Sequence, residues 1–496
     1  MESHEYLCRL ALLPFLTALQ STTLNTHKVV RMTSESFIDE ARIWDTIAAN
    51  ASPDPARIND ILAKALEGKG LESADLAALL APMPPDQEQQ LFAAAFALKE
   101  KMYGNRIVLF APLYISNECG NRCAYCAFSA SNTDLKRRSL TPDDIVQEVH
   151  ILQNMGHKRV LAVYGEHPKW DAKAIADSIV VIHGVKQHAG AEIRRTNVNC
   201  APLDIDGFRR LQDVGIGTYQ CFQETYHRET YAEIHLGGRK KDFLWRLWAM
   251  HRAQEAGVDD VGLGVLFGLA DHRFELLALL AHAQDLEKKH GVGPHTISVP
   301  RIEPAQNSDL SHNPPHVITD QVFKRIVAVT RLAMPYTGMI ITTRENAQLK
   351  RELLRLGISQ MSAGSRTYPG AYADALVNRP EAQQFWVGDE RSLPEIVEDL
   401  QRMGFMPSFC TACYRLGRTG EEFMGFAKTA FIHKFCEPNA LTSYAEYLED
   451  YATPELRDAG RRFIEAQTAA MPEEGRRLTM QKRLAAIDAG ERDLYI

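Results

Sequence analysis

The most informative part of this chain is the segment Ile107-Val-Leu-Phe-Ala-Pro-Leu-Tyr-Ile-Ser116, followed by the loop Asn117-Glu-Cys119-Gly-Asn-Arg-Cys123-Ala-Tyr-Cys126. The segment is apolar and rich in β-branched and aromatic residues, which is typical of a strand buried in a sheet. A helical pattern follows the loop at residues 142–155. A strand, a loop and a helix in this order predict the first βα unit of a parallel sheet.

The same unit recurs along the chain. Further β-rich runs are each followed by a helical pattern of about 10 to 20 residues, and we predict strands at residues 159–165, 192–199, 217–222, 261–267, 295–299, 338–342 and 358–362. Strands that alternate with helices in this way predict the α/β fold class and a (βα)8 TIM barrel over residues 106–370. The active site of such a barrel lies at the carboxyl ends of its strands.

Helical patterns flank the predicted barrel. Residues 32–105 form an N-terminal helical segment, and residues 371–496 form a mainly α-helical C-terminal domain, because the β-rich runs stop after Pro369. We interpret residues 1–31 as an extension that is either untranslated, with translation starting at Met32, or disordered. Its apolar run at residues 7–19 is too short to span a bilayer and lacks the positive charge that precedes a signal peptide, so we expect no membrane association.

The composition excludes several classes of protein. The chain has 496 residues, of which 45% are hydrophobic and 24% are charged, as in ordinary globular proteins. It carries 56 Lys and Arg against 63 Asp and Glu, a net charge of −7. An acidic balance opposes the counterion release that drives nonspecific nucleic-acid binding, so nucleic acid is not an expected partner.

Six of the nine cysteines fall into two tight groups instead of spreading out as a disulfide framework does. The first group, Cys119, Cys123 and Cys126, has the spacing C-x3-C-x2-C directly after the first predicted strand. Three thiolates at this spacing can hold three corners of a 4Fe-4S cluster and leave one iron open to another ligand. A structural zinc site or a set of buried thiols is the alternative, but this is not a usual zinc spacing and no histidine follows closely.

The second group lies in the predicted helical domain. Cys410, Cys413 and Cys436 have the spacing C-x2-C-x22-C, which again provides three thiolates without a fourth. A second 4Fe-4S cluster with an open iron fits this set. Zinc fits it equally well on spacing alone, because His433 lies near Cys436.

The cysteine loop after the first strand resembles that of the radical S-adenosylmethionine (SAM) enzymes. The resemblance implies that SAM binds the open iron and is split to a 5′-deoxyadenosyl radical. Gly165 and Glu166 are similar to the family's Gly-Gly-Glu signature, which receives the SAM ammonium group. By the same resemblance Glu224 would accept the ribose hydroxyls, and Tyr125 would approach the adenine. Gly238-Arg239-Lys240 departs from the family's Gly-Pro-Lys, which leaves open which cation meets the SAM carboxylate.

The two cysteine groups together resemble the HydG family of radical SAM tyrosine lyases, which mature FeFe-hydrogenase. Runs at residues 195–199, 222–227, 291–301 and 362–366 are similar to that family. The resemblance implies cleavage of the Cα–Cβ bond of L-tyrosine to p-cresol and dehydroglycine. The second cluster, with an extra iron linked through free L-cysteine, would then convert dehydroglycine to carbon monoxide and cyanide for assembly of the H-cluster. A path between the two sites would keep these products enclosed.

Further residues follow from this resemblance. Arg344, after the seventh predicted strand, is expected to bind the tyrosine carboxylate through its planar fork of donors, and Ser362 and Arg366 would complete the pocket. An ion pair at the barrel rim is the alternative for these residues. His295 is the expected protein ligand of the extra iron, with a structural role as the alternative.

The expected partners are L-tyrosine and SAM as substrates, a reductant such as ferredoxin or flavodoxin, and other hydrogenase maturation proteins. Exposed clusters are oxygen-sensitive, so we expect an anaerobic cytoplasm. One rival interpretation is a tyrosine lyase of the 2-iminoacetate synthase type for thiazole biosynthesis. Another is a non-catalytic iron-sulfur scaffold or electron carrier.

Overall fold

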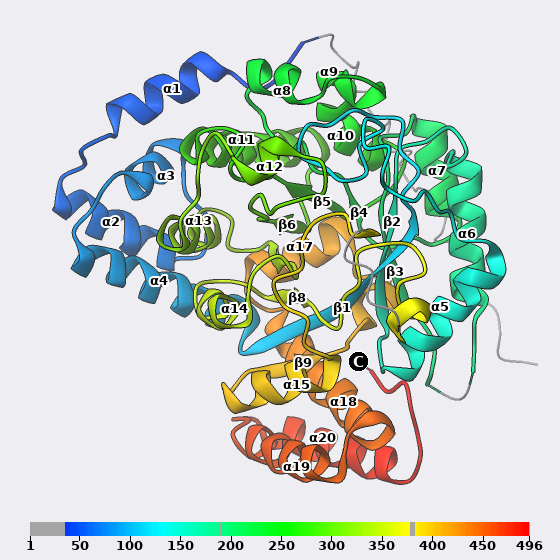
Figure 1. The fold of residues 1–496 in the computed structure, drawn as a ribbon. Helices are drawn as coiled ribbons and strands as arrows, with labels where there is room; N and C mark the ends of the chain where they lie inside the picture. Colours follow the sequence, from blue (N-terminus) through cyan, green and yellow to red (C-terminus); the bar gives the residue numbers. More distant parts are fainter. Residues whose placement is uncertain (1–34, 188–189, 377–381, 496) are drawn as a thin grey trace, which may run out of the picture. The chain divides into compact units, whose positions relative to one another are not determined.

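A computed structural model describes residues 35–187, 190–376 and 382–495 of the chain (Figure 1). The predicted extension at residues 1–31 lies outside the described residues. Eight parallel strands form a closed barrel in the order β2-β3-β4-β5-β6-β7-β8-β1, and β1 closes it by pairing with β2. The strands are β1 (Arg106–Ser116), β2 (Arg159–Tyr164), β3 (Arg195–Asn199), β4 (Tyr219–Gln220), β5 (Val261–Gly264), β6 (Thr296–Ser298), β7 (Gly338–Ile341) and β8 (Gln360–Ser362). The structure confirms the predicted α/β barrel.

Strand β1 is longer than the other barrel strands and has three partners along its length. Its carboxyl half pairs with β2, residues 108–110 pair with β8, and residues 106–108 pair in parallel with β9 (Met406–Ser408). The sequence predicted a mainly α-helical domain after Pro369, and it did not predict β9, the one strand of this part of the described chain. Strand β9 is short and contains Pro407, which suits an edge strand and leaves little β pattern to detect.

Helices cover the outside of the barrel, as the alternating pattern predicts (Figure 1). Most of them begin with an Asp, Asn, Thr or His side chain that accepts a hydrogen bond from the first turn, for example Asp171, Asp204 and Thr319. The helices between the strands are α5 (Pro142–Asn154), α6 (Ala172–Gly184), α7 (Ile205–Asp213), α8 (Arg228–Ile234), α9 (Phe243–Leu247), α10 (Ala249–Glu255), α11 (His272–His290), α12 (Asp309–His312), α13 (Asp320–Ala333) and α14 (Ala347–Leu354).

The N-terminal helices extend this outer layer. Helix α4 packs on α13, and α1 and α3 pack on α11, so the segment joins the same hydrophobic core as the barrel. The apolar faces of these helices are buried there, which stabilises the barrel wall on that side. The helices are α1 (Glu40–Ala49), α2 (Pro55–Leu66), α3 (Ser73–Leu80) and α4 (Pro85–Tyr103).

The C-terminal part is helical apart from β9. Helix α18 is its centre, because it packs on β9, α19 and α20. Pro438 lies within the first turns of α18, near Cys436. The helices are α15 (Leu393–Arg402), α16 (Ala412–Arg415), α17 (Gly420–Lys428), α18 (His433–Tyr451), α19 (Pro454–Ala469) and α20 (Glu474–Asp488). Within the described residues, no helix is both long and apolar enough to cross a membrane.

Candidate active site and second cysteine site

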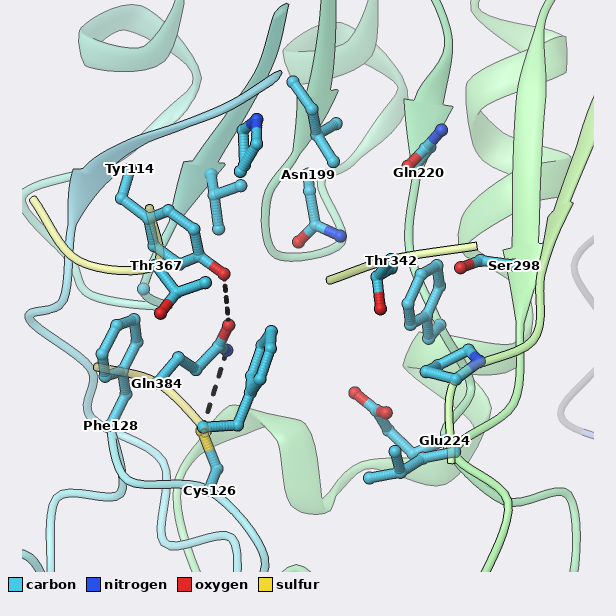
Figure 2. A pocket seen from close by; sticks show the side chains of 18 of the residues that line it. Tyr114, Cys126, Phe128, Asn199, Gln220, Glu224, Ser298, Thr342, Thr367 and Gln384 are labelled. Atoms are coloured by element: carbon cyan, nitrogen blue, oxygen red, sulfur yellow. Dashed lines mark hydrogen bonds between the residues drawn. The ribbon is translucent and has the colours of Figure 1, made fainter. Parts of the chain in front are cut away.

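A cavity of about 200 Å³ opens at the carboxyl ends of the barrel strands. Its lining comes from seven of the barrel strands and from the loops that follow the strands, including Leu266 after β5, which is where a barrel of this type places its active site. Figure 2 shows Asn199, Gln220, Ser298 and Thr342 around this space, with Glu224 facing it from the loop after β4.

The three cysteines of the first group all line this cavity. Their loop is held by Arg137, whose guanidinium donates to backbone carbonyl oxygens on both sides of the triad at 2.6–3.1 Å. Gln384 accepts from the Tyr114 hydroxyl at 2.7 Å and lies 3.8 Å from the Cys126 sulfur (Figure 2). Burial raises the pKa of Cys123 to about 12, so free thiolates are unfavourable here and a bound cation such as cluster iron would compensate them.

Gly165 and Glu166 follow β2 and pack directly against the cysteine loop. The Gly165 N–H donates to Ser116 at 2.8 Å, and the Gly120 N–H donates to the Glu166 carbonyl oxygen at 2.8 Å. Of the two Glu166 carboxylate oxygens, Oε2 accepts from Asn121 at 2.7 Å, whereas Oε1 is buried without a hydrogen-bond partner in the described structure. A buried carboxylate oxygen with a free lone pair, beside a cysteine triad, suits a ligand ammonium group.

The backbone of Glu118 lies so close to Gly165 that a larger residue at position 165 is expected to destabilise the protein. A Cβ atom there would collide with the Glu118 carbonyl oxygen, which is backbone and cannot rotate away. We expect Gly165→Ala to lower the free energy of unfolding by about 1–3 kcal/mol, as overpacking does, measured by urea denaturation. Gly184→Ala is the control, because no atom lies within 4 Å of its Cβ position. Equal urea midpoints for wild type and Gly165→Ala would contradict the prediction.

Glu224 forms a buried charge cluster with two cations. Lys240 Nζ lies 2.6 Å from Glu224 Oε1, and an Arg246 guanidinium nitrogen lies 3.8 Å from it. Burial acts to raise the pKa of Glu224, but Lys240 and Arg246 outweigh it and hold that pKa below its usual value. Glu224 also has a φ of 71°, a backbone conformation that is uncommon for residues other than glycine and that recurs at active sites.

This cluster bears on the identity of the cation that would meet a ligand carboxylate, which the sequence left open. Lys240 and Arg246 both line the cavity, whereas Arg239 does not and its guanidinium lies over the Trp245 ring. The cation available to a ligand carboxylate in this part of the cavity is therefore Lys240 or Arg246. Arg246 lies on α9 and belongs to no motif, so no sequence pattern pointed to it.

Tyr125 lines the same cavity and is buried. Its hydroxyl lies 3.0 Å from His235 Nε2, and Lys240 Nζ lies 5.4 Å from its ring centre. The ring is therefore fixed in orientation beside the Glu224 cluster. A fixed aromatic face at this position suits stacking on a planar ligand group.

Two of the three expected substrate residues line the cavity, and the third does not. Arg344 and Ser362 line the cavity, and the Arg344 guanidinium lies over the Phe385 ring at 3.5 Å. Arg344 Nε and Ser362 Oγ are buried and have no hydrogen-bond partner among the described residues. Arg366 is not among the described residues that line the cavity, and its backbone N–H donates to the Tyr372 hydroxyl at 3.4 Å.

A second, smaller cavity of about 50 Å³ lies at the opposite, amino-terminal end of the barrel. Cys410, Cys413 and Cys436 all line it, together with residues at the amino ends of several barrel strands. His433, the histidine of the zinc alternative, is not among the described residues that line it and packs against Gly104. Among the described residues, no three His, Cys, Asp or Glu side chains lie close enough together to bind one metal ion. The cysteines of a 4Fe-4S cluster can lie farther apart, because each thiolate binds a different iron.

His295 faces the second cavity as expected. Asp260 Oδ1 lies 3.3 Å from its Nδ1, and its Nε2 lies 2.7 Å from the Tyr414 hydroxyl. Burial lowers the pKa of His295 to about 4, so the imidazole is neutral at physiological pH. A neutral imidazole with a carboxylate behind Nδ1 is the usual arrangement of a histidine that ligates a metal through Nε2.

Two arginines that no sequence motif marked also line the second cavity. Arg106 and Arg159 line it from the amino ends of β1 and β2. Arg159 donates through a terminal guanidinium nitrogen to the Cys410 carbonyl oxygen at 2.9 Å, and the Nε atoms of both Arg159 and Arg106 are buried without a hydrogen-bond partner in the described structure. Burial acts to lower the pKa of Arg106, but the charges of Cys436, Tyr103 and the other two cysteines together outweigh burial and raise that pKa. A positive charge beside three thiolates suits an anionic cluster or a carboxylate ligand.

Both cavities therefore contain donor sets that fit the groups implied for them. The first cavity combines three thiols with buried unpaired oxygen and nitrogen atoms of Glu166, Thr342, Ser362 and Arg344. The second combines three thiols with a neutral histidine and the unpaired Nε atoms of Arg106 and Arg159. Buried polar atoms normally have partners, so these sets indicate sites for polar ligands.

The two cavities are separated by one layer of side chains. On β1, Val108 lines the second cavity and Phe110 the first, and Gln360 and Ser362 divide in the same way on β8. Residues two apart face the same side of a strand and are about 7 Å apart along it. The two cavities therefore lie close together inside one barrel, although their cysteines come from different parts of the chain.

Comparison with known proteins agrees with this geometry. The Radical SAM superfamily matches residues 113–281, and the Biotin and Thiamin Synthesis associated domain matches residues 298–406. The barrel, the cysteine triad at its carboxyl end and these matches define a radical SAM enzyme, a class that uses a 4Fe-4S cluster and SAM.

Solved structures narrow the class further. The crystal structure of HydG, a maturase of the FeFe-hydrogenase, has a TM-score of 0.90 and 45% identity and covers 93% of this chain and 100% of that chain. HydG from Carboxydothermus hydrogenoformans has a TM-score of 0.78 and 43% identity, covering 90% and 97%. The chain belongs to the HydG family of radical SAM maturases. A 2-iminoacetate synthase of Escherichia coli (strain K12) is 32% identical over 362 residues, 72% of this chain and 92% of that enzyme.

Proposed function

We propose that this enzyme cleaves L-tyrosine to p-cresol and dehydroglycine and converts dehydroglycine to carbon monoxide and cyanide for FeFe-hydrogenase assembly. The observation that carries the proposal is the presence of two cysteine-lined cavities at opposite ends of one barrel, one side-chain layer apart. Two steps that use different clusters need two sites, and a short distance between these sites limits the hydrolysis of a reactive intermediate.

In the first cavity, Cys119, Cys123 and Cys126 would hold a 4Fe-4S cluster. When bound, the cluster and SAM together supply a 5′-deoxyadenosyl radical. Glu166 Oε1 would accept the SAM ammonium group, because it is buried and unpaired. Glu224 would accept the ribose hydroxyls, with Lys240 or Arg246 meeting the SAM carboxylate and Tyr125 lying against the adenine.

Arg344 and Ser362 would bind the tyrosine carboxylate. A buried guanidinium above the Phe385 ring presents its donors to the cavity in a fixed plane, which suits two-point binding of a carboxylate. The surrounding side chains exclude water from the reacting bond. Arg366 keeps its proposed place in this pocket only if it moves toward the cavity when substrate binds.

In the second cavity, Cys410, Cys413 and Cys436 would hold a second 4Fe-4S cluster, and His295 would bind an extra iron that is also linked to L-cysteine. When bound, these groups supply the metal site for the conversion of dehydroglycine. The neutral His295 ring offers Nε2 as a ligand once the Tyr414 hydroxyl turns away from it. Arg106, whose Nε is unpaired, would hold an anionic group beside the thiolates.

The proposed partners are a reductant such as ferredoxin or flavodoxin and other hydrogenase maturation proteins. The proposed location is an anaerobic cytoplasm, because open-iron clusters are destroyed by oxygen. The amino-terminal position of the second cavity supports separate delivery of the product, away from the face that binds SAM.

The test is an assay of the protein reconstituted anaerobically with iron and sulfide. SAM, dithionite, L-tyrosine and L-cysteine are added, and p-cresol, carbon monoxide and cyanide are measured. We expect all three products. p-Cresol without carbon monoxide would favour the 2-iminoacetate synthase type of lyase, and intact SAM with no p-cresol would favour a non-catalytic scaffold.

A further inference from the structure

A carboxylate in the first cavity has no part in the function proposed above. Glu303 lies in the loop after β6 and lines the cavity. Arg344 lies in the loop after β7, and β6 and β7 are paired neighbours in the barrel. The two loops therefore present an acidic and a basic side chain to the same space.

The charged neighbours of Glu303 leave it without a strong partner. The nearest cation is Arg301, 4.0 Å away, but Glu345 already binds the Arg301 guanidinium at 2.7–3.1 Å and Asp320 binds it at 2.8 Å. Arg344 is the other cation whose charge acts on Glu303. Glu303 is thus a half-buried carboxyl group whose own cation is shared with two other carboxylates.

These surroundings bring the pKa of Glu303 close to neutral pH. Burial and, after it, the Glu345 carboxylate raise its pKa to about 7, against the weaker opposing effects of Arg301 and Arg344. A carboxyl group of this kind is ionised part of the time at neutral pH and can both accept and hold a proton.

A free α-amino acid brings two charges into this cavity. Its carboxylate has Arg344 as a partner, and its ammonium group needs an anion. Removing a hydrogen atom from an ammonium group would leave a positively charged radical in a buried space. Loss of a proton before that step leaves a neutral amine instead.

Resting on the proposed function, we infer that Glu303 binds the ammonium group of the substrate amino acid and takes a proton from it as general base. The ammonium N–H bond breaks, its electron pair stays on nitrogen, and the proton forms an O–H bond on the Glu303 carboxylate. The products of this step are a neutral amine and a neutral carboxylic acid. Arg344 and Glu303 together then select a substrate with an α-amino acid head group.

Binding measurements test the recognition step without turnover. Protein loaded with iron and sulfide is dialysed with SAM, without reductant, against L-tyrosine or 3-(4-hydroxyphenyl)propanoate, which lacks the amino group. We expect Glu303→Gln to weaken L-tyrosine binding about tenfold, as loss of one charge-assisted hydrogen bond does, and to leave the analogue unaffected. Glu352→Gln, an exposed carboxylate paired with Lys324, is the control and should change neither affinity.

The pH profile tests the proton transfer. For the wild type we expect kcat/KM for p-cresol formation to rise with pH through about 7, because Glu303 must be ionised to act as a base. For Glu303→Gln we expect lower values without that inflection, rising instead toward the pKa of the free amino group. If Glu303→Gln bound L-tyrosine and the analogue with the same relative affinities as the wild type, or kept the same inflection in kcat/KM, the role of Glu303 would be overturned. The proposed function would not be affected by either result. A wild type that neither binds tyrosine nor makes p-cresol would overturn the proposed function together with this inference.

Discussion

Replacing Cys123 by alanine is expected to abolish SAM cleavage and p-cresol formation. Cys123 is one of three thiols that line the cavity at the carboxyl end of the barrel, and all three proposed cluster ligands are needed when no fourth is present. Loss of the cluster removes the radical source, so the rate should fall by on the order of 10⁶-fold, to the background of the uncatalysed reaction. The measurement is 5′-deoxyadenosine and p-cresol after anaerobic reconstitution.

The matched control is Cys221→Ala. Cys221 is also buried, but it is not among the described residues that line either cavity. We expect this variant to keep its iron content and both activities. A Cys123→Ala protein that still cleaves SAM would show that the triad is not the radical centre.

The double variant Cys410→Ala/Cys413→Ala is expected to lose carbon monoxide and cyanide completely and to keep p-cresol formation close to wild type. The two cavities share the barrel interior but no cysteine ligands, so the first can work when the second is emptied. Dehydroglycine should then leave the protein and hydrolyse. The measurement is the ratio of carbon monoxide to p-cresol, with iron content lowered by one cluster.

Parallel loss of both products would contradict this separation. It would mean that the second cysteine group is needed for the fold or for tyrosine cleavage itself. The thermal stability of the double variant distinguishes these two explanations, because a folding defect lowers it and a purely catalytic coupling does not.

Much of the fold could be predicted because its signals are local. Each barrel strand is a short apolar run followed by a helical pattern, and the structure confirms all eight strands within a few residues. Strand β9 escaped prediction because Met406-Pro-Ser408 has almost no β pattern of its own. It forms because the amino end of β1 extends beyond β8 and offers unpaired backbone groups there.

The candidate site divides in the same way. The cysteines were singled out by their spacing, whereas Glu166, Glu224, Arg344 and His295 were singled out by resemblance to the family. The sequence motif already included Lys240, but its ion pair with Glu224 joins two loops that only the fold places side by side. Arg106 and Glu303 carry no motif, and nothing in their neighbouring residues distinguishes them from ordinary surface charges.

The sequence by itself determined that this chain is a parallel barrel with two groups of three thiols, because hydrophobic alternation and cysteine spacing are properties of short segments. Only the tertiary structure decided that the second group meets the amino-terminal end of the barrel, one side-chain layer from the first cavity. That arrangement depends on β9 pairing with β1, a contact between residues about 300 positions apart. The free energy of such a contact comes from packing and backbone pairing across the whole fold, which no local pattern records.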